Sequence, residues 1–133
     1  MFYFQFVGYK FLSEVCGGKY EFVTFTDDDT FIDWSKLNEF MALEDTSQAT
    51  TYCLKGKQIE LDSAPYNGKY WLWHNLWPSG YLPPSYCNGQ CAGLTPSAVE
   101  KIYTEAKQTN RTDFRLEDFY YVGILRMVFI LVH

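Results

Sequence analysis

The residues most able to do chemistry in this sequence are three adjacent carboxylates, Asp27, Asp28 and Asp29. They follow residues 19–26, whose aromatic and β-branched side chains predict a strand, so the acids stand at its carboxyl end. In open α/β sheets ligands bind at this edge, and hard oxygen ligands there suit Mg²⁺ or Mn²⁺ bridging to a phosphate-bearing substrate. A charged turn that leaves a strand explains the same residues without a ligand. The motif alone is compatible with either interpretation.

A second pair of carboxylates, Glu117 and Asp118, stands next to the apolar residues Phe119 and Tyr120. Partial burial there would raise the pKa of a carboxyl group and suit it to accept a proton. The alternative is an acid that is favoured at the N-terminus of a helix by the helix dipole.

An aromatic loop is expected at residues 69–84 (KYWLWHNLWPSGYLPP), where prolines interrupt a run of tryptophans and tyrosines. Such rings can form a lid held by ring packing, or a stacking wall for a sugar acceptor. His74 in this loop is expected to pack or to lie at the surface rather than to bind a ligand.

The segment from Tyr86 to Gly93 is rich in small residues, and its two glycines, Gly89 and Gly93, allow close approach of the backbone to a ligand. It lacks the GxGxxG spacing of dinucleotide-binding loops. On its own, this segment therefore indicates no particular ligand.

Three helices are expected to position these segments. Apolar residues recur at helical spacing through residues 4–15, and Gly17-Gly18 is a natural stop. Asp33 is a suitable N-cap for a second helix, while Thr95 and Pro96 supply a cap and a first-turn proline for a third. Each of the last two helices carries an apolar face, formed by Trp34, Leu37, Phe40 and Met41 in the second and by Ala98, Val99, Ile102, Tyr103 and Ala106 in the third.

The second helix is expected to end near residues 44–47, and short strands are expected after it. Residues 50–55 and 57–61 have strand composition and flank Gly56, so this part has hairpin character. The order of strand, acidic turn and helix, followed by a hairpin, indicates an α/β class.

The composition restricts the function classes. The 133 residues suffice for one domain with a core, and a net charge of -5 without a Lys/Arg cluster argues against nucleic acid. The cysteines Cys16, Cys53, Cys87 and Cys91 could form two disulfides, one disulfide with free thiols, or a metal site. Asn110 begins an N-glycosylation sequon, which favours an oxidising compartment. Neither apolar terminal run reaches the ~20 residues of a membrane-spanning helix.

Taken in order, these segments resemble the inverting β-1,3-glycosyltransferases of the galactosyltransferase and N-acetylglucosaminyltransferase type. The resemblance rests on FLSEVCGGKYEFV, on the acidic motif TDDDTF, on YLPPSYCNGQCAG and on LEDFYYVG, with a helix between the last two. Phe25 replaces the family's usual lysine, Gln90 and Cys91 interrupt its glycine triplet, and LEDFYYVG has one extra aromatic residue. The resemblance covers residues 11–125.

The resemblance implies a partial Rossmann-like nucleotide-diphospho-sugar transferase fold of the GT-A type, with a mostly parallel sheet and an aromatic loop or hairpin insertion. Asp27 and Asp29 would hold Mn²⁺ (or Mg²⁺) against the diphosphate of a UDP-sugar donor, and Asp118 would be the general base. Galactose or N-acetylglucosamine would be transferred with inversion, in β-1,3 linkage, to a glycan acceptor on a glycoprotein or glycolipid. The donor would contact Asp28, Asn88, Gly89 and Glu117, and the acceptor would contact Trp71, Trp73, Trp77 and Tyr86.

In the family, further nucleotide-binding strands and a membrane anchor precede the position that matches Met1. Residues 1–133 are therefore expected to form a single partial domain, the catalytic half, with little transferase activity by itself. By the same resemblance the location is the lumenal side of the Golgi membrane, with the membrane reached only through an anchor absent from this chain. Two other hypotheses stay open, a catalytically inactive sugar-binding module that kept the aromatic loop and an unrelated metal-dependent phosphoryl-transfer protein.

Overall fold

The computed structural model describes residues 3–53, 91–109 and 119–125. Within these ranges the strands form a three-stranded sheet in the order β1-β3-β2. The strands are β1 (Val23–Thr26), β2 (Thr51–Cys53) and β3 (Cys91–Leu94). β2 confirms the first of the two short strands expected after residue 50, and the second lies outside the described residues.

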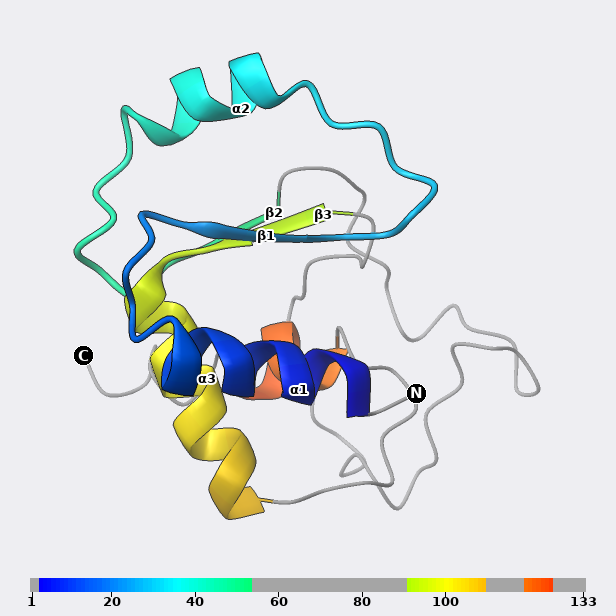
Figure 1. The fold of residues 1–133 in the computed structure, drawn as a ribbon, viewed down its shortest axis with the longest axis vertical. Coiled ribbons are helices and arrows are strands. Elements are labelled where there is room, and N and C mark those ends of the chain that lie inside the picture. Colours follow the sequence, from blue (N-terminus) through cyan, green and yellow to red (C-terminus); the bar gives the residue numbers. More distant parts are fainter. Residues whose placement is uncertain (1–2, 54–90, 110–118, 126–133) are drawn as a thin grey trace, which may run out of the picture.

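Helices lie on both sides of this sheet (Figure 1). One side carries α2 (Trp34–Met41), and the other carries α1 (Tyr3–Lys10), η1 (Phe11–Val15), α3 (Pro96–Thr109) and η3 (Phe119–Leu125). This layering is consistent with the predicted α/β class. Among the described residues, no helix combines the length and the apolar character needed to cross a membrane.

The directions of the strands differ from the expected mostly parallel sheet. β1 and β2 both pair antiparallel with β3, with Thr26 opposite Cys91 and Cys53 opposite Ala92. The prediction of a parallel sheet is therefore wrong for these three strands. Since β1 and β2 both run opposite to β3, they run in the same direction and end at the same edge of the sheet. β3 begins at that edge.

β1 is also shorter than residues 19–26. Its ladder with β3 stops at the pair of Val23 with Leu94. Beyond Leu94 the chain turns into α3 through Thr95 and Pro96, and a proline has no N–H to continue a ladder. The partner strand, rather than the composition of β1, thus sets the length.

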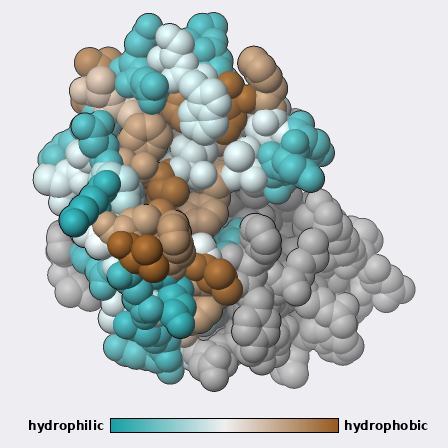
Figure 2. All heavy atoms as spheres, viewed as in Figure 1, coloured by the Kyte–Doolittle hydropathy of each residue, from teal (hydrophilic) through white to brown (hydrophobic). Residues whose placement is uncertain are grey.

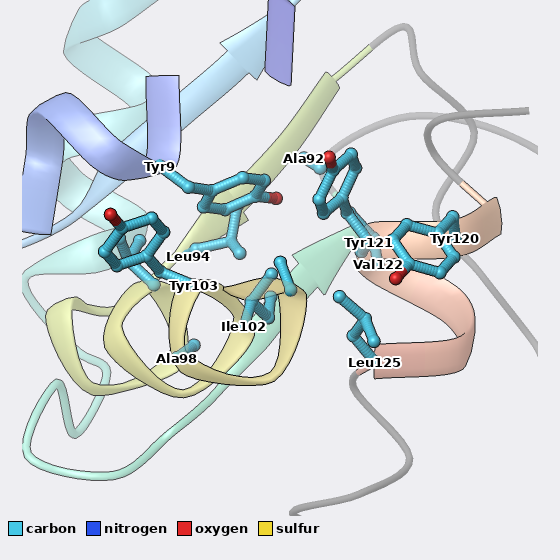
Figure 3. Packing of buried hydrophobic residues seen from close by; sticks show 12 residues of the cluster. Tyr9, Ala92, Leu94, Ala98, Ile102, Tyr103, Tyr120, Tyr121, Val122 and Leu125 are labelled. Carbon is cyan, nitrogen blue, oxygen red and sulfur yellow. The ribbon is translucent and has the colours of Figure 1, made fainter. Parts of the chain in front are cut away.

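The hydrophobic core lies between the sheet and the helices α1, α3 and η3 (Figure 3). Tyr9 of α1 is fully buried at its centre, with ring centroids 4.9 Å from Phe25 of β1 and 5.2 Å from Tyr121 of η3. Close approach of α1 to β1 depends on Gly8, because a Cβ there would stand 3.1 Å from Phe25 Cε1. The other buried residues of this core are Ala92, Leu94, Ala98, Val99, Ile102, Tyr103, Ala106, Tyr120, Val122 and Leu125.

The first helix ends where the sequence predicts. α1 continues into the π-helical turn η1, in which the N–H of Cys16 donates to the carbonyl of Phe11 at 3.1 Å. Gly17 and Gly18 then take positive φ values of 55° and 71°, which side-chain-bearing residues rarely adopt. The helix therefore ends at a fixed point, and the chain turns there toward β1.

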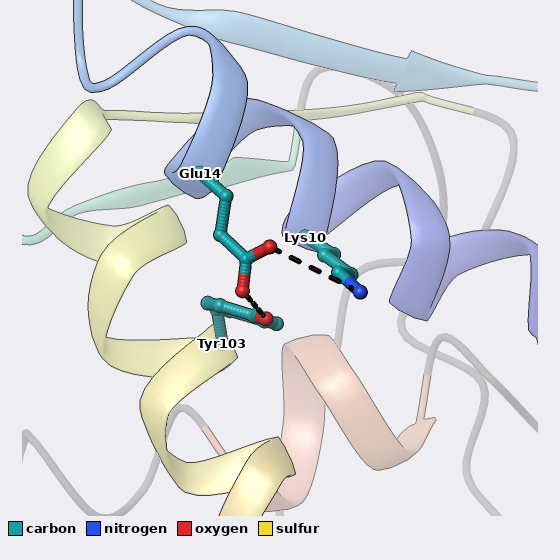
Figure 4. Close-up of polar contacts among 3 residues, drawn as sticks. All are labelled: Lys10, Glu14 and Tyr103. Atoms are coloured by element: carbon teal, nitrogen blue, oxygen red, sulfur yellow. Dashed lines mark hydrogen bonds and ion pairs between the residues drawn. The ribbon is translucent and has the colours of Figure 1, made fainter.

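A polar contact also attaches this helix to α3 (Figure 4). The hydroxyl of Tyr103 donates to the carboxylate of Glu14, and Lys10 Nζ lies 3.9 Å from the same carboxylate. Lys107 Nζ lies 4.4 Å from the centre of the Tyr103 ring. The hydrogen bond to Glu14, with burial and nearby acidic charge, raises the pKa of Tyr103 from 10.0 to about 12.

The predicted start of α3 is confirmed. The Ala98 N–H donates to Thr95 Oγ1 at 3.4 Å, and Pro96 occupies the first helical position. All five apolar positions predicted to face the core are buried, namely Ala98, Val99, Ile102, Tyr103 and Ala106. The prediction succeeds because the cap and the apolar spacing are local in the sequence.

α2 is only partly as predicted. Its cap is confirmed, since the Lys36 N–H donates to Asp33 Oδ1 at 3.2 Å, and Leu37 and Met41 are buried. Trp34 is 57% exposed, and Phe40 remains 44% exposed although its ring meets Tyr52 edge-on at 5.9 Å. Trp34 and Phe40, which the sequence placed on the same face, thus stay largely exposed, because burial of Leu37 and Met41, one turn apart, is enough to hold this short helix.

Candidate active site

The acidic segment lies in a turn at the carboxyl end of β1. The N–H of Thr30 donates to the carbonyl of Asp27 at 3.2 Å, which closes a four-residue turn with Asp28 and Asp29 at its centre. All three acidic residues are exposed. The predicted position after a strand is therefore confirmed, and the turn presents the carboxylates to solvent.

The register of the sheet brings a second predicted segment to this turn. Thr26, the last residue of β1, pairs with Cys91, the first residue of β3. Gly89 and Asn88 stand two and three residues before Cys91 in the sequence, although they lie outside the described residues. The antiparallel pairing thus joins the acidic motif to the small-residue segment directly. The resemblance assigned both segments to the donor site, but the sequence did not predict that they pair.

The donor set of the turn fits one kind of metal site. Mg²⁺ and Mn²⁺ are commonly held by one or two carboxylates together with substrate phosphates, and the turn offers Asp27 and Asp29 in this way. In the described ranges no three His, Cys, Asp or Glu side chains gather into a cage for a metal ion. The arrangement therefore suits a metal shared with a ligand better than a site built from protein alone.

The aromatic core links β1, which leads into this turn, to the helix η3. Tyr9 packs between Phe25 and Tyr121. Phe25 stands two residues before Asp27, and Tyr121 stands three residues after Asp118 in the sequence. Asp118 itself lies outside the described residues, but the helix that begins immediately after it is anchored by this ring cluster.

η3 is held in the core at several points. Tyr120, Tyr121, Val122 and Leu125 are buried, and the hydroxyls of Tyr120 and Thr109 lie 2.6 Å apart. The chain that follows Asp118 is thus fixed to both α3 and α1. The remaining predicted site residues also fall outside the described residues: Asn88, Gly89, Glu117, Trp71, Trp73, Trp77, Tyr86 and Asn110.

A hollow of about 620 Å³ adjoins the acidic turn. Its lining comes from the end of β1 and from the segment that leads into α2, namely Thr26, Thr30, Phe31, Ile32, Asp33 and Trp34. The sequence did not predict this feature, and it placed Trp34 only on the apolar face of the second helix. The only sequence signal for it was the density of large apolar residues directly after the acids.

The cysteines contribute little to the described site. Cys16 is a half-buried free thiol in the structure. Cys91 is buried in β3 next to the acidic edge. The possible partners, Cys53 and Cys87, are not placed by their side chains in the part of the chain that the structure describes.

A protein-family model matches most of the chain. The family described as galactosyltransferase matches residues 7–129, a range that includes β1, the acidic turn, all later elements and η3. A comparison with curated proteins found no match.

Proposed function

Because the chain belongs to the galactosyltransferase family, we propose that it transfers galactose or N-acetylglucosamine from a UDP-sugar to a glycan in β-1,3 linkage with inversion. Membership makes the chain a glycosyltransferase, with a sugar donor and a glycan acceptor as its substrates. The sugar, the linkage and the stereochemistry are the proposed part. They are supported by the order of the motifs TDDDTF, YLPPSYCNGQCAG and LEDFYYVG.

The observation that carries the proposal is the placement of the acidic turn. Asp27, Asp28 and Asp29 are exposed at a sheet edge, beside the entry of the segment that contains Gly89. Exposed carboxylates in a tight turn repel one another, and a divalent cation bound with a diphosphate relieves this repulsion. In this proposal Asp27 and Asp29 hold Mn²⁺ or Mg²⁺, and Asp28, Asn88, Gly89 and Glu117 contact the donor.

The proposed reaction is a single displacement. Asp118 accepts the proton of the acceptor hydroxyl while that oxygen forms a bond to the anomeric carbon of the donor sugar. The bond from the anomeric carbon to the UDP oxygen breaks on the opposite side, so an α-linked donor gives a β-linked product. When bound, the metal ion would supply positive charge to stabilise the departing diphosphate.

Two substitutions test these roles separately. Asp29→Ala is expected to lower Mn²⁺-dependent UDP affinity at least about tenfold, because one of the two carboxylate ligands is lost. Asp118→Asn is expected to leave UDP affinity nearly unchanged and to lower kcat by about 10²–10⁴-fold, the usual contribution of a general base. Titration calorimetry with UDP and Mn²⁺ and a transfer assay with UDP-galactose measure the two effects.

Glu39→Ala is the matched control, because Glu39 is an exposed acid of α2 outside the turn and the hollow. Its UDP affinity should equal that of the wild type. Metal-independent binding of UDP, or phosphate binding without any preference for uridine, would contradict the proposed function. The second outcome would favour phosphoryl transfer instead.

A further inference from the structure

We propose that the hollow beside the acidic turn binds a hexopyranose ring, with Trp34 and Phe31 as its stacking surface. The inference rests on the proposed function, since it names the part of the site that would receive a sugar ring. The hollow has a volume of about 620 Å³ and opens broadly to solvent, so a hexose with its substituents can enter it and lay one face of its ring on the lining.

Two large aromatic rings are exposed at one place beside the acidic turn. Phe31 is 93% exposed and Trp34 is 57% exposed, and both line the hollow. Exposed apolar surface on this scale is unfavourable in water unless a ligand or partner covers it. The rings stand within seven residues of Asp27 in the sequence, at the edge where the donor would bind.

Trp34 belongs to a helix, α2, that is held in place by its cap and by buried side chains. Trp34 is the first residue of α2, directly after the N-cap Asp33. The carboxylate of Asp33 accepts from the Lys36 N–H at 3.2 Å and lies 3.6 Å from Lys36 Nζ, so it stabilises the helix start. Leu37 and Met41 are buried and hold the helix in place. A stacking residue on a seated helix is pre-organised for its ligand.

The lining of the hollow combines apolar and hydroxyl-bearing side chains, which suits a sugar ring. A pyranose ring has an apolar C–H face that suits an aromatic wall and hydroxyls that need hydrogen-bonding partners. Phe31, Ile32 and Trp34 give the apolar wall, and the hydroxyl of Thr30 can donate or accept. The one charged lining residue is Asp33, which is acidic, so the lining disfavours a phosphate group and favours a neutral ring.

The ring could belong to the donor sugar or to the acceptor, and binding measurements separate these sources. Ligand-observed NMR titrations of the full 133-residue chain would use UDP, UDP-galactose and lactose as probes. Trp34→Ala should weaken binding of either UDP-galactose or lactose about tenfold, the scale expected for losing a large stacking surface. Trp34→Phe keeps an aromatic face and should restore most of this affinity.

Leu43→Ala is the matched control, because Leu43 is 87% exposed on the segment after α2 but does not line the hollow. This variant should bind all probes like the wild type. A loss in UDP-galactose affinity at unchanged UDP affinity assigns the hollow to the donor sugar, and a loss confined to lactose assigns it to the acceptor.

Three results would overturn the inference. These are no saturable sugar binding by the wild type, Trp34→Ala affinities within about twofold of the wild type, or an equal loss for UDP and UDP-galactose, which would indicate the nucleobase. Its failure differs from failure of the proposed function. Mn²⁺-dependent UDP binding without any Trp34 effect would refute the sugar subsite alone, whereas Trp34-dependent lactose binding without UDP binding would refute the transferase proposal alone.

Discussion

At the scale of single residues, Thr95 connects more of the structure than its role as a helix cap requires. It is fully buried, and its hydroxyl donates to the carbonyl of Gln48 at 2.6 Å and accepts from the Thr50 N–H at 3.0 Å. The same oxygen lies 3.4 Å from the Ala98 N. One side chain thus fixes the approach to β2 and the start of α3 together.

Replacing Thr95 should therefore be costly. Thr95→Val keeps the shape but leaves the Thr50 N–H without its side-chain acceptor and removes the cap, so the free energy of unfolding should fall by about 2–4 kcal/mol. Thr95→Ser keeps the hydroxyl and should lose less. Urea unfolding at constant slope measures both changes, and equal stability of the valine variant would show that water replaces these contacts.

At the scale of elements, the structure shows how a turn of π-helix is attached to a long α-helix. Glu14 in η1 accepts from the Tyr103 hydroxyl of α3, and Lys10 lies on the other side of the same carboxylate. The sequence predicted both helices but not this contact, because residues 14 and 103 are far apart in the chain.

This contact predicts a specific dependence of stability on alkaline pH. The pKa of Tyr103 is raised from 10.0 to about 12 in the folded state, so the protonated phenol favours folding. Its contribution is fully present below pH 10.0 and is lost as the pH rises through about 12. Tyr103→Phe should remove this part of the decline, as followed by circular dichroism in urea at a series of pH values.

The comparison needs a control because the chain has 11 tyrosines. Glu14→Gln keeps the phenol but removes the charged acceptor, so it should flatten the same pH range. An unchanged profile in both variants would show that the hydrogen bond contributes nothing to alkaline stability.

At the scale of the whole molecule, Tyr9 of α1 links the sheet to the later helices α3 and η3. Its ring lies between Phe25 and Tyr121, and through them between the strand that ends at the acids and the helix that follows Asp118. The described core therefore holds the strand that precedes the acidic turn and the helix η3 against one aromatic ring.

Tyr9→Ala should accordingly destabilise the protein by about 3–5 kcal/mol, the usual cost of removing a buried aromatic ring. Hydrogen exchange should speed up in both β1 and η3, because both lose the same packing partner. Val7→Ala on the same helix removes a side chain that is 54% exposed, and it should change stability by less than about 0.5 kcal/mol. Protection that falls in only one of the two elements would contradict the proposed linkage.

The surface of α1 and η1 carries an exposed apolar stripe. Val7, Phe11 and Val15 recur at four-residue spacing and are all more than half exposed. Figure 2 shows hydrophobic side chains gathered over this helix on the face toward the viewer. The stripe is unusual for a solvated helix, whose exposed face is normally polar.

The sequence by itself determined the features that depend on neighbouring residues. Asp33 and Thr95 cap helices, Gly17-Gly18 ends one, and the apolar spacing of α3 selects its buried face. The position of the acids at a strand end is also such a feature, because residue composition and the residues that start or stop an element are local signals. The family, too, was recognised from the order of short motifs.

Only the tertiary structure decided the features that depend on distant partners. The antiparallel register of Thr26 with Cys91, the exposure of Trp34 and the packing of Tyr9 between two elements each join residues that no local pattern connects. A strand's direction and a ring's burial are set by which surfaces meet when the chain collapses. A helix cap or an apolar repeat indicates only which secondary structure a segment can form. The pairing of Thr26 with Cys91 and the hollow beside the acids are therefore seen only in the folded chain.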